Sequence, residues 1–468
     1  MSLNAGHPTP KSVHSLQVTD ATLSWRNLDD AEESVSTHEI VFTIDFSTAQ
    51  RPNYIVYVLR EDADAQSHPF HLDLFQTDAI PAELHGHLIN GIPPHLQPTP
   101  SNKVDVIVST KSGTGRAQSF WQAALQPLLQ SASSHPVVEQ YNLVVTQDAQ
   151  SVRQYAKTID GPPSTARTII LLSGDGGVAD LLNGREPVPD APLPLMALLP
   201  LGTGNALFHS LHKPCATTPG PTPLVLALRT LFLGAAANLP VFEAKFTPGS
   251  HMVAHADGSQ AALQLPHRRQ VSSLYGAIVA SHGFHASIVY ESDTPAYRAH
   301  GAKRFGMVAQ ELLKLSHPYK AALDVRPPSS AAASEDTFER DAHETHGYIL
   351  VSMVSNLERN FTISPASRPL DGKLHLVHFG AVGGDRAMEA MMKAYDGGKH
   401  VDVKWDDGER VRYEEVGEVR IVSGEDDERW RVFCVDGTIV QVARGGGMSV
   451  ARASRELLRV LVDEGARA

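Results

Sequence analysis

Four short apolar runs without polar–apolar alternation constrain the fold of this 468-residue chain more than any other feature. They occupy residues 104–108, 142–146, 168–172 and 195–199. A strand that is buried on both faces reads as a continuous apolar run, as in a parallel sheet covered by helices. Helix-compatible segments, such as residues 117–130, lie between several of these runs. The alternation of strand and helix predicts an α/β domain with a parallel sheet.

The segments before and after this region have a different pattern of apolar and polar residues. Residues 22–25, 40–46 and 54–59 are rich in β-branched and aromatic residues and predict strands. Several short alternating segments between residues 401 and 442 are separated by acidic and Asp-Gly turns, and they predict an antiparallel β-sandwich. The leucines of residues 449–464 have helical spacing and predict a C-terminal helix.

Proline-rich residues 91–102 indicate a linker, because each proline fixes φ and disfavours helix before it. The expected division has three parts. Residues 1–100 are a β-rich N-terminal region with the linker, residues 101–245 are the α/β domain, and residues 246–468 are the β-sandwich with the C-terminal helix.

Charge and cysteine content exclude some partners. Lysine plus arginine is 40 and aspartate plus glutamate is 52, so the net charge is −12. Broad nucleic-acid binding needs a positive surface, and we therefore expect no nucleic-acid partner. Cys215 and Cys434 are too few for a disulfide framework and favour a reducing compartment. With no secretory signal visible, we expect a cytoplasmic protein.

One apolar stretch, residues 224–242, has the length of a membrane span. Arg229, Asn238 and Pro240 interrupt it. A charge at the centre of a membrane helix costs at least about 2.5 kcal/mol. We therefore expect a buried helix that runs into a strand.

Glycine-rich segments follow three of the four apolar runs: STKSGTG at 109–115, SGDGG at 173–177 and LGTGN at 201–205. Ligands of open α/β sheets bind at the carboxyl ends of the strands, where helix N-termini offer unpaired N–H groups to anions. Glycine lets the backbone approach a phosphate closely. No segment has the P-loop or the dinucleotide-binding pattern. The three loops predict a phosphate-binding site of another type.

Asp175 lies between two glycines of the second loop, just before a helical segment. Two roles are open to it. It is a helix cap, or it is a carboxylate beside a phosphate site that acts as a general base or holds the water of a Mg²⁺ ion.

These motifs resemble those of the diacylglycerol kinase and sphingosine kinase superfamily, which NAD kinases share in part. SGDGGVADLLNG (173–184) resembles its phosphate-binding signature, LPLGTGNAL (199–207) its third nucleotide loop and VIVSTKSGTGRA (106–117) its first. Further similar segments lie at residues 283–305, 360–377 and 431–442. The combination of SGDG with GNAL leans to the sphingosine kinase branch. The resemblance implies an ATP-binding α/β domain followed by a β-sandwich, with the active site between them.

The resemblance also implies roles for individual residues. Asp175 matches the general base of the family, and Mg-ATP is the implied cofactor. The residues implied in ATP binding are Lys111, Gly113, Thr146, Gly174, Gly176, Asp180, Gly202, Thr203, Gly204, Arg298, Arg304 and Asp436. Those implied on the substrate side are Ser173, Val289 and Asp293. No metal ligand is assigned.

The chain departs from the family pattern at three places. Ser109-Thr110 replaces the usual Asn-Pro of the first loop. The late Asp-Gly-Glu motif reads Asp436-Gly437-Thr438, which also fits an ordinary hairpin turn. Val289 stands where sphingosine kinases have the aspartate that pairs with the substrate amine.

We therefore expect an ATP-dependent lipid kinase with a lipid substrate and a transient, peripheral contact with membranes through residues 267–269. A kinase for a soluble substrate such as NAD, and a non-catalytic regulator that binds nucleotide or lipid, are the alternatives. Apolar residues 273–284 are either the lining of a lipid slot or core strand, and core strand is the stronger expectation.

Overall fold

In the computed structural model, the four apolar runs are strands β9 (Asn102–Val108), β10 (Asn142–Val145), β11 (Ala166–Ser173) and β12 (Leu195–Pro200). They lie in the order β10-β9-β11-β12, and each neighbouring pair is parallel. Along β11, Ile169 and Leu171 pack into one core, whereas Ile170 and Leu172 pack into another. Burial on both faces removes the need for alternation, and the prediction of a parallel sheet is confirmed.

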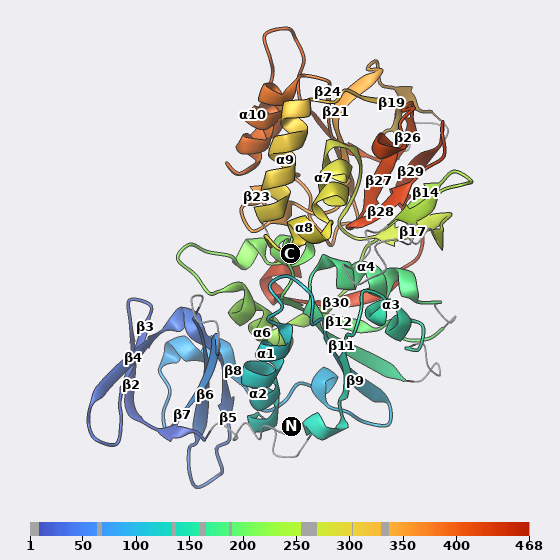
Figure 1. The fold of residues 1–468 in the computed structure, drawn as a ribbon. Coiled ribbons are helices and arrows are strands. Elements are labelled where there is room, and N and C mark those ends of the chain that lie inside the picture. Colours follow the sequence, from blue (N-terminus) through green and yellow to red (C-terminus); the bar gives the residue numbers. More distant parts are fainter. Residues whose placement is uncertain are drawn as a thin grey trace.

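The structure describes residues 9–62, 68–132, 137–159, 165–186, 190–253, 269–301, 303–328 and 337–467. Figure 1 shows a β-rich N-terminal part in blue, the α/β part in cyan and green, and a second β-rich part in yellow to red. An α/β part joined to β-rich parts was predicted and is found. The proposed domain limits at residues 100 and 245 remain a prediction.

Helices cover both faces of the parallel sheet. One face carries α1 (Ala117–Phe120), a π-helical turn (Trp121–Leu125), α2 (Gln126–Ser131) and α6 (Pro223–Leu233). The other carries α3 (Ser151–Ala156), α4 (Asp175–Gly184) and α5 (Ala206–Leu211). Buried helix α6 leads into β13 (Ala235–Leu239), as the sequence predicted for residues 224–242. Among the described residues, no helix has the length and apolar character to cross a membrane.

The predicted C-terminal helix is wrong. Residues 449–464 contain the end of strand β29 (Gly447–Arg452) and all of β30 (Leu458–Val462). Strand β30 joins the sheet of the α/β part, parallel to β12 and antiparallel to β13. Its side chains alternate between the cores on the two faces, with Leu458 and Val460 on one and Leu461 on the other. Pairing with strands more than 200 residues earlier overrides the helical spacing, because it buries both faces of the segment.

The N-terminal part has two small sheets. Strands β1 (Lys11–Ser12), β5 (Ile40–Asp45), β6 (Tyr54–Glu61), β7 (Phe70–Thr77) and β8 (Leu88–Ile89) form one, and β2 (His14–Thr19), β3 (Thr22–Arg26) and β4 (Glu32–Ser36) form the other. The three predicted strands in this part are confirmed. Arg229 on α6 donates to the carbonyls of Thr37 and Ile40, and the rings of Phe42 and Phe232 lie 4.2 Å apart. These contacts dock the N-terminal part against α6.

The second β-rich part is one 14-stranded sheet in which neighbouring strands are antiparallel. Besides β29, its strands are β14 (Phe242–Phe246), β15 (His251–Val253), β16 (Arg269–Gln270), β17 (Ser273–Gly276), β18 (Val279–Gly283), β19 (Tyr319–Arg326), β20 (Glu339–Arg340), β21 (Thr345–Ser352), β24 (Leu374–Gly380), β25 (Arg412–Val416), β26 (Glu418–Ser423), β27 (Val432–Val435) and β28 (Thr438–Gln441). Side chains of β14, β17, β19, β26 and β29 meet those of β18, β21, β24, β27 and β28 in one core.

Several shorter elements surround this sheet. Strands β22 (Asn356–Glu358) and β23 (Phe361–Thr362) form a separate hairpin, and the helices are α7 (Phe284–Ser292), α8 (Pro295–Arg298), α9 (Lys303–Leu315) and α10 (Gly384–Ala394). Residues 401–405, which alternate like a strand, instead contain the end of a 3-10 turn (Lys399–Asp402) and an isolated bridge between Lys404 and Arg410. Residues 273–284 are β17, β18 and the start of α7, and they are mostly buried in the core, as the stronger expectation had it.

Candidate active site

The three glycine loops meet at the carboxyl edge of the parallel sheet. A Cβ on Gly202 would overlap the backbone of Gly174, and a Cβ on Gly113 would overlap the backbone of Leu201 and Gly202. Gly113 also has a φ of +54°, which L side chains rarely adopt. The sequence placed these glycines in one site, and the structure brings them into direct backbone contact.

Polar side chains fix the loops to one another. The N–H of Gly174 donates to Ser112 Oγ at 3.0 Å. Thr110 donates its N–H to Thr146 Oγ1 at 3.1 Å, which ties the first loop to the end of β10. Asn205, with a φ of +53°, accepts the N–H of Gly202 at 2.9 Å. Ser112 and Asn205 were not among the predicted site residues. The sequence could have indicated them, because Ser112 lies inside the first glycine loop and Asn205 inside the third.

Asp175 is the first residue of α4, but its carboxylate accepts hydrogen bonds from the start of another helix, α5. Its two oxygens accept the N–H groups of Ala206 at 2.8 Å and Leu207 at 3.2 Å, at the start of α5. Burial of the carboxylate raises the pKa of Asp175, and the backbone N–H groups oppose that rise. The capping role left open by the sequence is therefore real, although the capped helix is α5.

Asp436 occupies the turn between β27 and β28. Its φ of +46° and that of Gly437, +85°, give the two-residue hairpin turn that an Asp-Gly pair favours. The carboxylate of Asp436 is buried and accepts the N–H groups of Ala277, Ile278 and Val279 at 2.7, 3.1 and 2.8 Å. Burial, together with the nearby charge of Asp175, raises the pKa of Asp436 to about 7.

The glycine loops therefore lie where the α/β part meets the second β-rich part. Ser210 on α5 accepts the N–H of Asn356 on β22 at 2.9 Å. Asn183 on α4 exchanges two 2.8 Å hydrogen bonds with the backbone of Tyr275 on β17. A Cβ on Gly204 would lie 3.0 Å from the carbonyl oxygen of Leu357. Helices α4 and α5, whose N-termini flank the site, are thus held by the opposite part of the chain.

The remaining residues predicted in the α/β part lie near the same edge. Ser173 is buried at the end of β11, and Thr203 is partly buried in the third loop. Lys111 is exposed on the first loop. Asp180 lies one turn along α4, where burial raises its pKa to about 6 against the opposing charge of Arg153.

The predicted residues of the second β-rich part form their own group. Asp293 accepts two hydrogen bonds from Arg298, at 3.0 and 2.7 Å, and lies 3.6 Å from Arg304. Val289 is half-buried on α7 and packs against a small core that includes Cys434 and Ile439. Helix α8, which carries Arg298, lies on the side of this part that faces the α/β part (Figure 1). The contacts of the described residues join neither Asp293 nor Val289 to the glycine loops.

The loops fit the phosphates of a nucleotide better than they fit a metal ion. Their close backbone contacts exclude side chains, and the Cα of Gly176 faces open space. Backbone N–H groups already occupy oxygens of both Asp175 and Asp436. The glycine backbone therefore leaves room for the close approach of phosphate oxygens.

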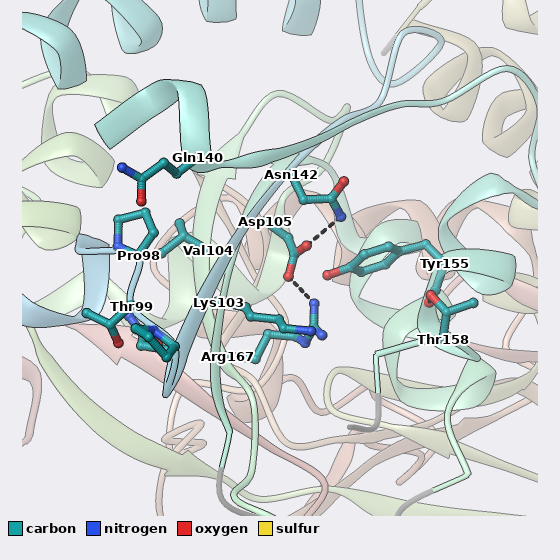
Figure 2. Close-up of a pocket in the computed structure, with 12 residues that line it drawn as sticks. Pro98, Thr99, Lys103, Val104, Asp105, Gln140, Asn142, Tyr155, Thr158 and Arg167 are labelled. Atoms are coloured by element: carbon teal, nitrogen blue, oxygen red, sulfur yellow. Dashed lines mark hydrogen bonds and ion pairs between the residues drawn. The ribbon is translucent and has the colours of Figure 1, made fainter. Parts of the chain in front are cut away.

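A cavity of about 610 Å³ lies elsewhere, at the amino ends of β9, β10 and β11. Figure 2 shows Asp105 in its wall, bonded to Asn142 and Arg167, with the hydroxyl of Tyr155 turned toward it. Because the glycine loops lie at the other ends of these strands, this cavity is separate from the candidate site. The buried charge of Asp105 is balanced by Arg167, which is a structural arrangement.

Comparison with known proteins finds similar solved structures and one matching family model. Three solved structures from Bacillus anthracis strain Sterne, two of proposed diacylglycerol kinases and one of a diacylglycerol kinase, are 14%, 15% and 13% identical to the chain. They cover 79%, 78% and 79% of it and 100%, 99% and 100% of their own chains, with TM-scores of 0.48, 0.46 and 0.45. No curated protein is significantly similar in sequence.

The family model of the diacylglycerol kinase catalytic domain matches residues 103–236. The matched segment contains all three glycine loops and Asp175, which are the residues that the structure brings together. This match makes residues 103–236 similar to the catalytic domains of diacylglycerol kinases.

Proposed function

We propose that the chain is an ATP-dependent lipid kinase that phosphorylates a hydroxyl group of a diacylglycerol-type lipid or a sphingoid base. The observation that carries the proposal is the meeting of three glycine loops with Asp175 inside the matched segment. Mg-ATP, when bound, supplies the phosphoryl group. The loops hold its phosphates through backbone N–H groups, because glycine permits close approach there.

Asp175 is the proposed general base. Each carboxylate oxygen has two acceptor sites, and the N–H groups of Ala206 and Leu207 take one on each oxygen. The N–H groups of Asn205 and of Asp175 itself also favour the charged carboxylate, and because the residue is only partly buried, we propose that one oxygen still accepts the proton of a lipid hydroxyl. The two backbone hydrogen bonds also fix the orientation of the carboxylate, which general-base catalysis requires.

The departures from the family pattern favour neutral lipids over sphingosine. A buried ammonium group needs a carboxylate partner. Val289 offers none, and Asp293 is already paired with Arg298 and Arg304. We therefore propose activity on diacylglycerol that equals or exceeds activity on sphingosine.

A non-catalytic, nucleotide-binding protein is the second candidate, and a specific observation favours it. Asp175 already has a structural task at the start of α5, and Thr438 replaces the glutamate of the family motif. Incubation of the purified protein with labelled ATP and a panel of lipids separates the two candidates. Transfer of label to a lipid supports the kinase, whereas saturable ATP binding without transfer to any lipid supports the second candidate.

We also propose transient, peripheral contact with membranes from the cytoplasmic side. Of the predicted contact residues 267–269, only Arg269 is among the described residues, and it is exposed on β16. Further support comes from α9 and α10, which lie side by side (Figure 1). Helix α9 exposes Met307 and Leu315, and helix α10 exposes Met392. Co-sedimentation with phosphatidylserine vesicles tests this contact. Met392→Ser is expected to weaken it, whereas Leu28→Ser, at an exposed site in the N-terminal part, is the control.

A further inference from the structure

A cluster of histidines and carboxylates lies in the second β-rich part, outside the candidate active site. His346 is on β21 and His378 is on the neighbouring strand β24. Asp341 and His343 precede β21, and Glu409 lies on the loop before β25. Figure 1 shows the paired strands β21 and β24 that hold the two buried histidines. Neither the kinase proposal nor the family match gives these residues a role.

Hydrogen bonding fixes how His346 faces the cluster. Its Nε2 lies 2.9 Å from the carbonyl oxygen of Ala321, an atom that only accepts. Nε2 of His346 therefore carries a proton, and in the neutral ring Nδ1 presents a lone pair. His378 Nε2 lies 2.7 Å from that Nδ1 and donates to it. A backbone carbonyl on the far nitrogen is the usual way in which proteins orient a metal-binding histidine.

The other nitrogen of His378 has no hydrogen-bond partner among the described residues. His378 is 1% exposed, and its Nδ1 lies 3.8 Å from Asp341 Oδ2. In the neutral ring, with Nε2 protonated, Nδ1 is an acceptor, and the carboxylate oxygen is an acceptor as well. Two acceptors that face each other in a buried place leave room for a cation between them. Buried polar atoms without a partner are rare in folded proteins.

We propose that Asp341, His346 and His378 bind one divalent transition-metal ion, with zinc as the best match to these ligands. When the ion binds, the proton between His346 Nδ1 and His378 Nε2 moves to His378 Nδ1, which faces Asp341, so that each ring offers the ion one lone pair. One ligand atom from each residue lies within 4.8 Å of the others. Zinc binds histidine nitrogen and carboxylate oxygen at about 2.0–2.2 Å, so its ligand atoms lie roughly 3.4 Å apart in a tetrahedral site. The separations of 2.7 Å between His346 Nδ1 and His378 Nε2 and of 3.8 Å between His378 Nδ1 and Asp341 Oδ2 lie on either side of that spacing.

The surroundings of the cluster suit a metal site. His343 bridges two acids, with Nδ1 2.6 Å from Asp341 and Nε2 2.8 Å from Glu409, and Arg412 donates to Asp341 at 3.0 Å. These contacts hold the Asp341 carboxylate in position. A cavity of about 380 Å³ reaches His343 and Glu409 from the surface and gives an ion a path inward.

The test is titration of the chelator-treated, full-length protein with Co²⁺, followed by displacement with Zn²⁺. The wild type is expected to bind one ion per chain, with visible absorption from a Co²⁺ ion bound by nitrogen and oxygen. His346→Asn and His378→Asn are each expected to weaken binding at least tenfold. His400→Asn is the matched control, since His400 is also buried and its Nε2 lies 3.0 Å from a backbone carbonyl oxygen. This variant should bind as the wild type does.

A second measurement needs no variant. X-ray absorption of the zinc-loaded wild type is expected to show a first shell of nitrogen and oxygen alone. A sulfur ligand would place the ion at Cys215 or Cys434 and overturn the proposal. Absence of saturable binding by the wild type, or equal affinity in folded His346→Asn, His378→Asn and wild type, would overturn it as well. Either result would leave the cluster as a proton-sharing structural group.

Discussion

Asp175 and Asp436 come from opposite sides of the junction between the α/β part and the second β-rich part, and the charge of Asp175 helps to raise the pKa of Asp436. Each carboxylate is held by backbone N–H groups of an element distant in sequence. Asp175 caps α5, and Asp436 accepts three N–H groups from the β17–β18 connection and the start of β18. The hydrogen bonds of each carboxylate stay within its own part of the chain, and only their charges couple the two across the junction.

Asp175→Asn tests the proposed base. Asparagine keeps the size of the side chain but removes its charge, so turnover should fall by about 10²–10⁴ while ATP binding remains. One N–H of α5 also loses its acceptor, and a modest fall in Tm should accompany the loss. Kinetics, ATP titration and thermal unfolding of the same preparation measure all three.

Asp105→Asn is the control for that substitution. Asp105 is another buried acid, paired with Arg167 and Asn142 at the opposite end of the sheet. Its variant should lose stability and keep turnover per folded molecule. Near-normal turnover in Asp175→Asn would leave Asp175 with the capping role alone.

The raised pKa of Asp436 predicts a pH dependence of stability. Its pKa is about 7 in the folded chain against an ordinary value of 3.8, so the folded state binds the proton more tightly than the unfolded state does. The stability from this group is fully present below about pH 4 and is lost as the pH rises through about 7. Asp436→Asn cannot titrate, so Tm should fall less between pH 5 and pH 8 in the variant than in the wild type. Parallel Tm curves for the two proteins would contradict the assignment.

Two glycines of the loops should respond differently to alanine. A Cβ on Gly202 meets the backbone of Gly174, so Gly202→Ala must separate the second and third loops and lower both Tm and ATP affinity. A Cβ on Gly176 meets nothing within 4 Å, and alanine favours the helix by about 1 kcal/mol. Gly176→Ala should keep or raise Tm, yet weaken ATP binding if phosphate occupies that open space. Unchanged ATP affinity in Gly176→Ala would move the phosphate site away from α4.

Gly204→Val tests the third loop from its outer side. A Cβ at position 204 would lie 3.0 Å from the carbonyl oxygen of Leu357 and 3.7 Å from Asp175 Oδ2. A β-branched side chain there should weaken ATP binding, because it fills the space beside the proposed base. A sharp fall in Tm with normal ATP affinity would make Gly204 a packing residue of the junction with β22.

Val289→Asp tests the preference for neutral lipids. The new carboxylate should shift relative activity toward sphingosine, through a charge-assisted hydrogen bond worth roughly 1.5–3 kcal/mol. Because Val289 packs against an apolar core, some stability should be lost. Initial rates with sphingosine and diacylglycerol measure the shift. Asp293→Ala is the companion variant, and a wild-type preference for sphingosine that disappears only in Asp293→Ala would overturn the role given to Val289.

The sequence alone determined the parallel sheet, its three glycine loops and the edge at which they lie. These features depend on local patterns, since burial on both faces removes alternation and a glycine-rich turn follows each strand. The family resemblance seen in residues 103–236 has the same origin. The hairpin turn at Asp436-Gly437 was likewise readable, because only two adjacent residues decide it.

Only the tertiary structure decided which groups each side chain contacts. Leu458 and Leu461 were spaced as in a helix, yet pairing with β12 and β13 made their segment a strand. Asp175 was read as a cap of its own helix or as a base, and the close approach of two loops made it the cap of α5. Asp341, His346 and His378 are separated by up to 37 residues and gather only because β21 and β24 pair. Contacts between residues distant in sequence depend on strand pairing and packing, which no local pattern encodes.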